Sequence, residues 1–236
     1  MADNSLSNTG RDYSIDIVRI LACLVVVLMH SPYPTHDANS NLYGAISFYT
    51  SPCIGLFFMI SGTLMLPVHH EMCVFLQKRL KKIVIPTLIW TIVYIILFYS
   101  SQRSDNLLIT LLSIPFSVQG HGVLWFMYTL VGLYLLAPII SPWLKENRKH
   151  EIELVLALWG LTLFYPVVDR WLLVNEDVTG VLYYFSGYAG YFLLGYYIKN
   201  LNGHIKKSIL LPLFMISIII PIVNKYLNLG LSTEAL

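Results

Sequence analysis

Apolar residues gather in seven long stretches of the chain, which short polar segments separate. The stretches cover roughly residues 14–31, 44–66, 84–100, 123–143, 151–168, 181–198 and 208–225. Each approaches the ~20 residues that an α-helix needs to cross a bilayer. None alternates apolar and polar positions as a half-buried β-strand does. The pattern predicts an all-α, polytopic membrane protein with about seven transmembrane helices.

The remaining segments complete the expected domain organisation. Residues 1–13 are polar and are predicted to form a disordered N-terminus. Residues 14–225 are predicted to form one transmembrane domain, followed by a short C-terminal tail at 226–236. A further apolar segment at 105–118 is too short to span the bilayer, so we expect it to be re-entrant or interfacial.

Lysine and arginine residues predict the orientation, because cytoplasmic loops of membrane proteins are enriched in both. With the N-terminus in the cytoplasm and seven crossings, the cytoplasmic segments hold eleven of the fifteen Lys and Arg residues. The opposite side receives three, and Arg19 lies inside the first stretch. We therefore predict a cytoplasmic N-terminus, with Arg19 near the inner leaflet and His30 near the outer one.

The composition agrees with a membrane protein and differs from that of a typical soluble domain. Hydrophobic residues make up 56% of the chain and charged residues 12%, whereas charged residues make up about 25% of a typical soluble domain. The net charge of +2 comes from topological signals, so we expect no nucleic-acid partner. The three cysteines are odd in number and predict no disulfide framework. His69, His70, Glu71 and Cys73 match no zinc-site spacing, so we expect no metal.

Arg19 and His30 form a polar pair in the first stretch. They are eleven residues apart, close to three helical turns, so both fall on nearly one face, about 16 Å apart along the axis. Such residues are costly to bury in a membrane and usually line a functional cavity. Asp16, one turn before Arg19, can pair with it and orient the guanidinium. The alternatives are an arginine that snorkels to the interface and a histidine that bonds to an outer loop.

A basic run, Gln77-Lys78-Arg79-Leu80-Lys81-Lys82, precedes the third stretch on the predicted cytoplasmic side. Basic residues in this position attract anionic lipid headgroups. Arg and Lys are also the usual partners of phosphate, so Lys78, Arg79 and Lys82 could clamp the phosphates of a cytosolic cofactor. The residues alone favour the lipid interpretation.

His121 and Trp125 lie at the predicted outer end of the fourth stretch, and Tyr191 lies in an aromatic run of the sixth. Tyr and Trp concentrate at bilayer interfaces, so an aromatic belt is the first interpretation. Aromatic rings also stack on sugar rings, which leaves a carbohydrate acceptor open. His121 could meet His30 across an outer vestibule. In the second stretch, Ser61-Gly62 is predicted to let two helices approach closely.

Together these residues resemble the acyltransferase-3 family of integral membrane acyltransferases. The resemblance rests first on the signature of Arg19, ten residues and His30. It continues through Phe57–Gly62, the basic run with Pro86, Leu124–Tyr128 and Gly190–Tyr196, and covers most of residues 14–200. The chain looks most like the branch that O-acetylates bacterial surface polysaccharides.

The resemblance implies a multi-pass O-acyltransferase of the bacterial inner membrane. It implies transfer of an acyl group, usually acetyl from cytosolic acetyl-CoA, to a hydroxyl of a cell-envelope polysaccharide or glycolipid. His30 would act as general base or carry the acyl group briefly, and Arg19 would hold the pantetheine or a phosphate. Arg79, Lys82 and Lys78 would bind the nucleotide phosphates, and Trp125 and His121 are expected to contact the acceptor. The bilayer and the glycan are the implied partners, and a homo- or hetero-oligomer stays open.

The chain departs from the family pattern in two respects. Lys82 stands where members usually have a second arginine, so a bidentate contact becomes a point charge. Members usually have more helices than the seven expected here, so the chain is expected to be short at its C-terminus. Two other classes therefore stay open, a polysaccharide exporter without chemistry and an inactive fragment. An exporter should depend on the polarity of its path more than on the identity of His30.

Overall fold

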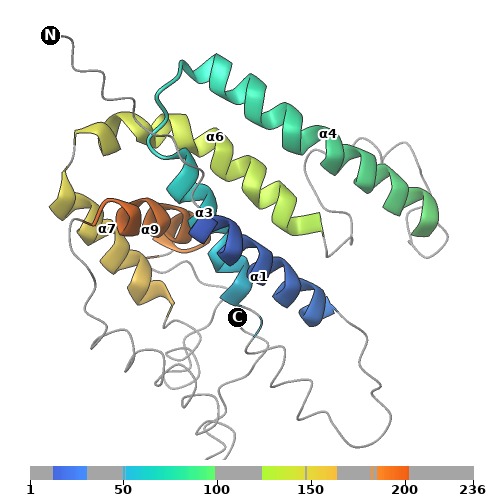
Figure 1. Cartoon of the computed structure of the whole chain (residues 1–236). Coiled ribbons are helices and arrows are strands. Elements are labelled where there is room, and N and C mark those ends of the chain that lie inside the picture. The colour runs from blue at the N-terminus through green and yellow to red at the C-terminus, as the bar shows by residue number, and fades with distance from the viewer. Residues whose placement is uncertain are drawn as a thin grey trace, which may run out of the picture. The chain divides into compact units, whose positions relative to one another are not determined.

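The structure, a computed structural model, describes residues 13–30, 50, 52–98, 124–146, 148–163, 182 and 185–201. In this part of the chain the regular elements are all helices (Figure 1). They are α1 (Tyr13–His30), α3 (Pro52–Met65), α4 (Met72–Phe98), α6 (Trp125–Lys145), α7 (Lys149–Thr162) and α9 (Ala189–Lys199). The predicted all-α class is confirmed for the described residues.

Six of the seven predicted stretches overlap one of these helices, and α4 begins twelve residues before its stretch. The seventh, 208–225, lies outside the described residues, as do 105–118, 1–12 and the tail at 226–236. Two helices, α1 and α6, are long and apolar enough to cross a membrane. The 21 residues of α6 reach about 31 Å at ~1.5 Å per residue, close to the ~30 Å hydrocarbon core. The total of seven crossings stays a prediction.

The chain divides into two compact units, residues 61–204 and residues 1–60 with 205–236. Each is described here by itself. The first of the helices, α1, belongs to the unit that contains the N-terminus. Its apolar side chains Ile20, Leu24 and Val27 are more than half exposed, at 59%, 61% and 67%. A helix that exposes apolar side chains of this size is suited to contact with lipid.

Three helices of the other unit, α6, α7 and α9, follow one another in alternating directions. A short turn joins α6 to α7, so these two run antiparallel. The end of α7 contacts the start of α9 through Trp159 and Tyr191, while Glu153 near the start of α7 bonds to Tyr197 near the end of α9. The two helices are therefore also antiparallel, and they lie side by side in Figure 1. It follows that α6 and α9 start at the same end of this unit.

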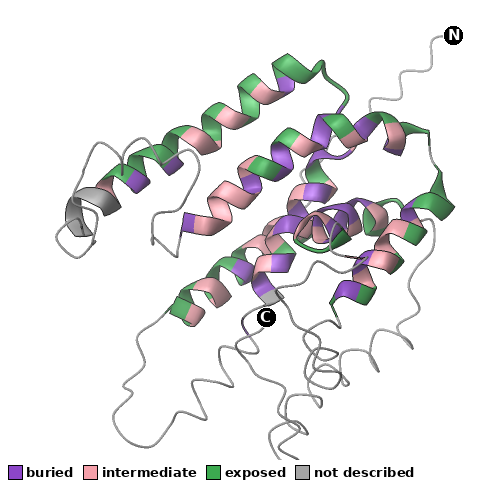
Figure 2. Cartoon of the chain, turned by 180° about the vertical axis from the view of Figure 1, so that it is seen from behind, coloured by how far each residue is buried: buried purple, intermediate pink, exposed green. Residues whose placement is uncertain are grey.

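Helix α4 packs along α6 through its second half (Figure 1). The buried Thr91 hydroxyl donates to the Thr87 carbonyl at 2.8 Å and lies 3.5 Å from the Tyr128 hydroxyl of α6. The Thr87 hydroxyl in turn donates to the Ile83 carbonyl at 2.7 Å. These bonds satisfy the polar atoms of the buried face, as an apolar environment requires. Exposed residues are spread along the rest of α4 (Figure 2).

The end of α3 contacts α9 almost backbone to backbone. A Cβ atom at Gly62 would collide with the carbonyl oxygen of Phe192, so this position has room only for glycine. Beside it, the Thr63 hydroxyl donates to the Gly195 carbonyl at 2.9 Å. The Lys199 ammonium donates to the Thr63 carbonyl at 2.9 Å, which satisfies one of the last carbonyls of α3. The predicted packing role of the Ser61-Gly62 dipeptide is confirmed for Gly62.

Candidate functional site

Arg19 and His30 lie on the single continuous helix α1, and the predicted helical register between them is confirmed. Arg19 Nη1 lies 3.3 Å from Asp16 Oδ1, so the predicted pair of these two residues is also present. The Arg19 side chain is 42% exposed and that of Asp16 22%. The bond uses one edge of the guanidinium, and the remaining donors of Arg19 can contact an anion.

The ring of His30 is oriented by its own helix. Its Nδ1 atom lies 3.0 Å from the carbonyl oxygen of Val26, one turn earlier. A carbonyl oxygen can only accept, so Nδ1 carries the hydrogen and donates it. In the neutral imidazole Nε2 then holds the lone pair. Because His30 is exposed at the end of α1, this lone pair is available to take a proton or attack an electrophile.

The predicted phosphate-binding residues Lys78, Arg79 and Lys82 lie in the first half of α4, and all are exposed. Lys78 and Lys82 are four residues apart and share one face. Thr87, on the buried side, is about half a turn away from Lys78 around the helix. No described residue forms a hydrogen bond or an ion pair with these three side chains. Their positive charge is therefore not neutralised within the described part of the chain.

Trp125, a predicted acceptor contact, is the first residue of α6. Its ring lies 5.1 Å from that of Tyr188, centroid to centroid, and Tyr188 lies 6.3 Å from Tyr191. Trp159 of α7 meets Tyr191 edge-on at 4.7 Å. We call these four residues the aromatic end of the unit, because they join the starts of α6 and α9 to the last turn of α7. His121, the other predicted contact, lies outside the described residues.

Two glycines shape the aromatic end. Gly187 has a φ of +94°, a conformation that side chains rarely tolerate, and it turns the chain into Tyr188. The indole N–H of Trp159 donates to the Gly187 carbonyl at 3.0 Å and holds this turn. A Cβ at Gly190 would collide with the Trp159 ring, so the absence of a side chain lets the indole lie against α9.

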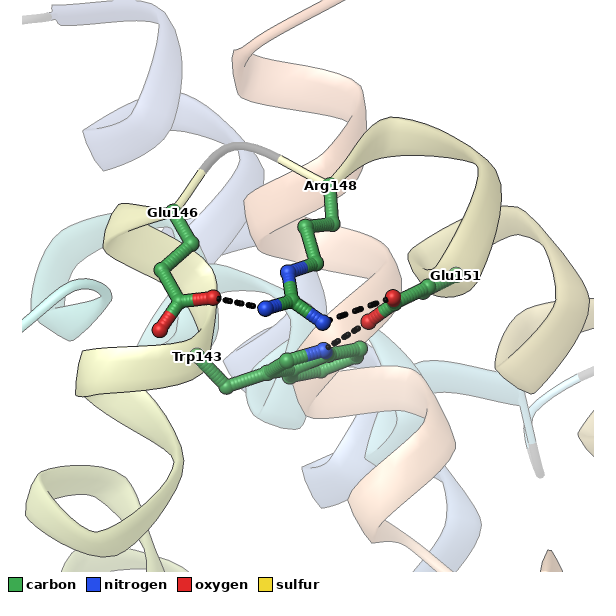
Figure 3. A network of polar contacts seen from close by, with 4 residues as sticks. All are labelled: Trp143, Glu146, Arg148 and Glu151. Carbon is green, nitrogen blue, oxygen red and sulfur yellow. Dashed lines mark hydrogen bonds and ion pairs between the residues drawn. The ribbon is translucent and has the colours of Figure 1, made fainter.

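The opposite end of the same unit is charged. Arg148 lies between two carboxylates, with Nη2 2.6 Å from Glu146 and Nη1 3.0 Å from Glu151 (Figure 3). The Trp143 indole donates to the other oxygen of Glu151 at 2.8 Å. We call these four residues the charged end. It closes the turn between α6 and α7, because Trp143 and Glu146 belong to the end of α6 and Glu151 to the first turn of α7.

The ionisable side chains of the charged end lie outside the apolar part of α7 and are in contact with water. The first five residues of α7, up to Glu153, include four charged or titratable side chains, so its apolar part begins after them. The hydrogen bond from Trp143 and those from Arg148 lower the pKa of Glu151 below its ordinary value. The hydrogen bond to Glu151 and the charge of Glu146 raise the pKa of Arg148. Both groups are well exposed, so this network contributes little to stability.

The structure places the candidate residues in two groups. Arg19 and His30 belong to the N-terminal unit, and the basic residues of α4 belong to the other unit together with Trp125. Sequence reasoning missed Tyr188 and Trp159. The spacing of Gly187 and Gly190 around an aromatic run was the available signal. Within the described ranges no cluster of three or more His, Cys, Asp or Glu residues could hold a metal ion.

Comparison with known proteins identifies the family. The acyltransferase-3 family model, described as an acyltransferase domain, matches residues 12–234. No curated protein and no solved structure matches the chain. The match covers almost the whole chain, including α1 with its Arg19 and His30 and every other described helix. The chain therefore belongs to the acyltransferase-3 family, and it is an acyltransferase with the apolar helices of a membrane protein.

Proposed function

We propose that this acyltransferase moves an acetyl group from cytosolic acetyl-CoA to a hydroxyl of a cell-envelope glycan, as a multi-pass protein of the bacterial inner membrane. The observation that carries the proposal is the hydrogen bond from His30 Nδ1 to the Val26 carbonyl. It leaves Nε2 as the proton acceptor, at the end of α1 that the charge distribution assigns to the outer leaflet.

In the proposed reaction His30 is the general base. Nε2 takes the proton of the acceptor hydroxyl while the hydroxyl oxygen attacks the thioester carbonyl carbon. The carbon–sulfur bond breaks, an ester forms on the glycan, and the CoA thiolate recovers the proton from the imidazolium. Arg19, which Asp16 orients, lies about 16 Å along α1 from His30 and would hold the pantetheine arm or a phosphate of the donor.

The nucleotide phosphates of the donor would bind to Lys78, Arg79 and Lys82 on α4. These side chains are exposed and have no anionic partner among the described residues. Arg79 can bind phosphate through two parallel hydrogen bonds, whereas the lysines supply point charges. Trp125 and His121 would contact the acceptor on the outer side.

The first experiment measures transfer of labelled acetyl from acetyl-CoA into glycan by membranes that contain the full chain. We expect His30→Gln and His30→Ala to reduce transfer by at least about 100-fold, the usual contribution of a positioned base. The matched control is His150→Gln, because His150 is fully exposed at the charged end. Transfer should keep its wild-type rate in this control. Equal transfer by wild type and His30→Ala, at equal membrane levels, would contradict the role of His30.

A second experiment tests the donor site with two substrates. Arg79→Gln should raise the KM for acetyl-CoA about tenfold, because it removes a charge-assisted phosphate contact. The KM for acetyl-pantetheine, which lacks the nucleotide, should not change. Lys145→Gln, which removes an exposed charge from the end of α6, is the control. A parallel rise in KM for both donors would place Arg79 outside the nucleotide site.

A further inference from the structure

The half-exposed rings of the aromatic end form a row. Trp125 and Tyr188 are tilted by 36° and Tyr188 and Tyr191 by 29°, so neighbouring ring planes are roughly parallel. All three side chains keep part of their surface exposed, whereas Trp159 is 5% exposed and stands almost perpendicular to Tyr191, at 76°. With centroids 5.1 and 6.3 Å apart, the three rings form an offset stack in which the part of each ring not covered by its neighbour stays exposed, and the buried Trp159 indole contacts its Tyr191 end.

We propose that Trp125, Tyr188 and Tyr191 form a platform on which a pyranose ring of the acceptor stacks, with Trp159 as the positioning residue behind it. One face of a pyranose presents several C–H groups, and the negative face of an aromatic ring attracts them. This inference rests on the proposed function for the presence of a glycan. It goes further by assigning the residues and the mode of contact.

The polar atoms of the row support a sugar ligand. No described residue accepts a hydrogen bond from the Trp125 indole N–H or the Tyr191 hydroxyl. In contrast, Trp159 donates to Gly187 and Tyr197 donates to Glu153 at 2.8 Å. An aromatic surface with available donors at its edge matches a sugar, which has an apolar face and hydroxyl groups around its rim.

The ring contacts differ from those of a lipid belt. Belt residues each direct a polar tip toward the headgroups. Here the rings come from three helices, α6, α7 and α9, and contact one another, and the Trp159 N–H bonds to the protein backbone. The Gly187 turn that Trp159 holds is what directs Tyr188 toward Trp125. These contacts require glycine at two positions and a fixed backbone conformation. Residues of a lipid belt require neither.

The two ends of the unit also agree with the side on which the acceptor is expected. Lys145, Arg148, Lys149 and Lys199 all lie toward the charged end. The described residues around the aromatic end, 124–128, 159–163 and 185–191, include no Lys or Arg. The excess of basic residues assigns the charged end to the cytoplasm and the aromatic end to the outer side.

Binding can be measured without any reaction. Saturation-transfer NMR would use the full chain in phosphatidylcholine nanodiscs and chitotriose, a trimer of N-acetylglucosamine, as the probe. We expect saturation of its axial C–H protons by the wild type. The apparent affinity should fall about tenfold in Tyr188→Ala and be retained in Tyr188→Phe, which keeps the ring. Trp143→Phe, an aromatic change at the opposite end, is the control.

The proposal is overturned if chitotriose receives no more saturation than from empty nanodiscs, or if Tyr188→Ala binds as well as the wild type. If the saturation signal changes with the lipid of the nanodisc and not with the variant, the aromatic end contacts lipid headgroups. This result would also overturn the proposal. Thermal melting of each variant separates lost folding from lost binding. Trp125→Phe and Tyr191→Phe, which keep a ring, repeat the test if an alanine variant unfolds.

Kinetics separate this inference from the proposed function. If acetyl transfer occurs, Tyr188→Ala should raise the KM for the glycan acceptor about tenfold while the KM for acetyl-CoA stays unchanged. Binding of chitotriose without any acetyl transfer would contradict the proposed function and leave the platform intact. Transfer with an unchanged acceptor KM in Tyr188→Ala would contradict the platform and leave the function intact.

Discussion

The aromatic end and the charged end of the unit of residues 61–204 use tryptophan in different ways. At the aromatic end, the Trp159 side chain is buried, and its indole donates to the carbonyl of the exposed Gly187 in a part-buried hydrogen bond. At the charged end, the Trp143 indole binds Glu151, whose side chain is 47% exposed. The two hydrogen bonds have similar lengths, 3.0 and 2.8 Å, but the part-buried one should cost more to lose, because water replaces a lost partner more readily at an exposed group.

The difference shows which contacts stabilise the packing of the helices in this unit. The charged end is a surface network whose hydrogen bonds water can replace. It therefore influences the orientation in the membrane and the local charge more than the free energy of unfolding. The aromatic end depends on close contacts at Gly190 and on a turn at Gly187 whose positive φ favours glycine. Between the two, Gly62 and Thr63 hold α9 against α3. Changes should therefore be more severe toward the aromatic end, and four experiments examine this expectation.

Gly62→Ala should have the largest effect, because it displaces α9, which carries Tyr191 of the aromatic end and packs against both α3 and α7. Its Cβ would collide with the Phe192 carbonyl, a backbone atom that cannot rotate away. We expect a loss of about 3 kcal/mol in the free energy of unfolding, measured by thermal or denaturant unfolding in nanodiscs. Gly132→Ala is the control, since no atom lies within 4 Å of its Cβ. A loss of similar size in both variants would contradict this explanation.

Gly190→Ala should disrupt only the aromatic end. The new Cβ would displace the Trp159 ring and with it the bond to Gly187, at a cost of about 2 kcal/mol. Gly160→Ala, in α7, meets no atom within 4 Å, and it should be neutral or slightly stabilising because alanine favours a helix by up to about 1 kcal/mol. Tryptophan emission should shift in the first variant and stay unchanged in the second. The reverse order of stabilities would refute the close contact.

Trp159→Phe and Trp143→Phe compare the two indole bonds directly. Each removes one N–H donor and keeps an aromatic ring. Trp159→Phe should lower the free energy of unfolding by about 1 kcal/mol, because it removes a part-buried hydrogen bond made by a buried side chain. Trp143→Phe should change it by less than about 0.5 kcal/mol, because water can bind Glu151 instead. Equal losses would mean that burial does not distinguish the two ends.

Acidification should produce the smallest effect, and at the charged end it acts through Glu151. The Trp143 and Arg148 hydrogen bonds favour the Glu151 carboxylate, so its pKa lies below the ordinary 4.5. The stabilisation that it contributes is complete above pH 4.5 and is lost as the pH falls through the lowered pKa. The NMR signal of the Trp143 indole should shift in this range and not in Glu151→Gln. A midpoint at or above 4.5 would contradict the network.

The predictions from sequence succeeded where they depended on local pattern. The Asp16–Arg19 pair and the close packing at Gly62 both follow from spacing or residue size, and both are present. Other residues were missed because their partners are distant in the chain. Tyr188 is 63 positions from Trp125, and nothing in either segment indicates that their rings meet. The seven crossings, the predicted orientation and the role of His121 remain predictions.

The sequence by itself determined the helical class, the family and the common face of Arg19 and His30. The helical class and the common face depend on apolar length and helical periodicity, which act between residues close in the chain, whereas the family rests on the match over residues 12–234. Only the tertiary structure decided that Trp125, Tyr188, Tyr191 and Trp159 form one aromatic end. It also decided that the Trp159 side chain is buried and that the Trp143 indole makes its hydrogen bond at the surface. Such contacts depend on how helices pack, and packing depends on the shapes of side chains that are far apart in the sequence.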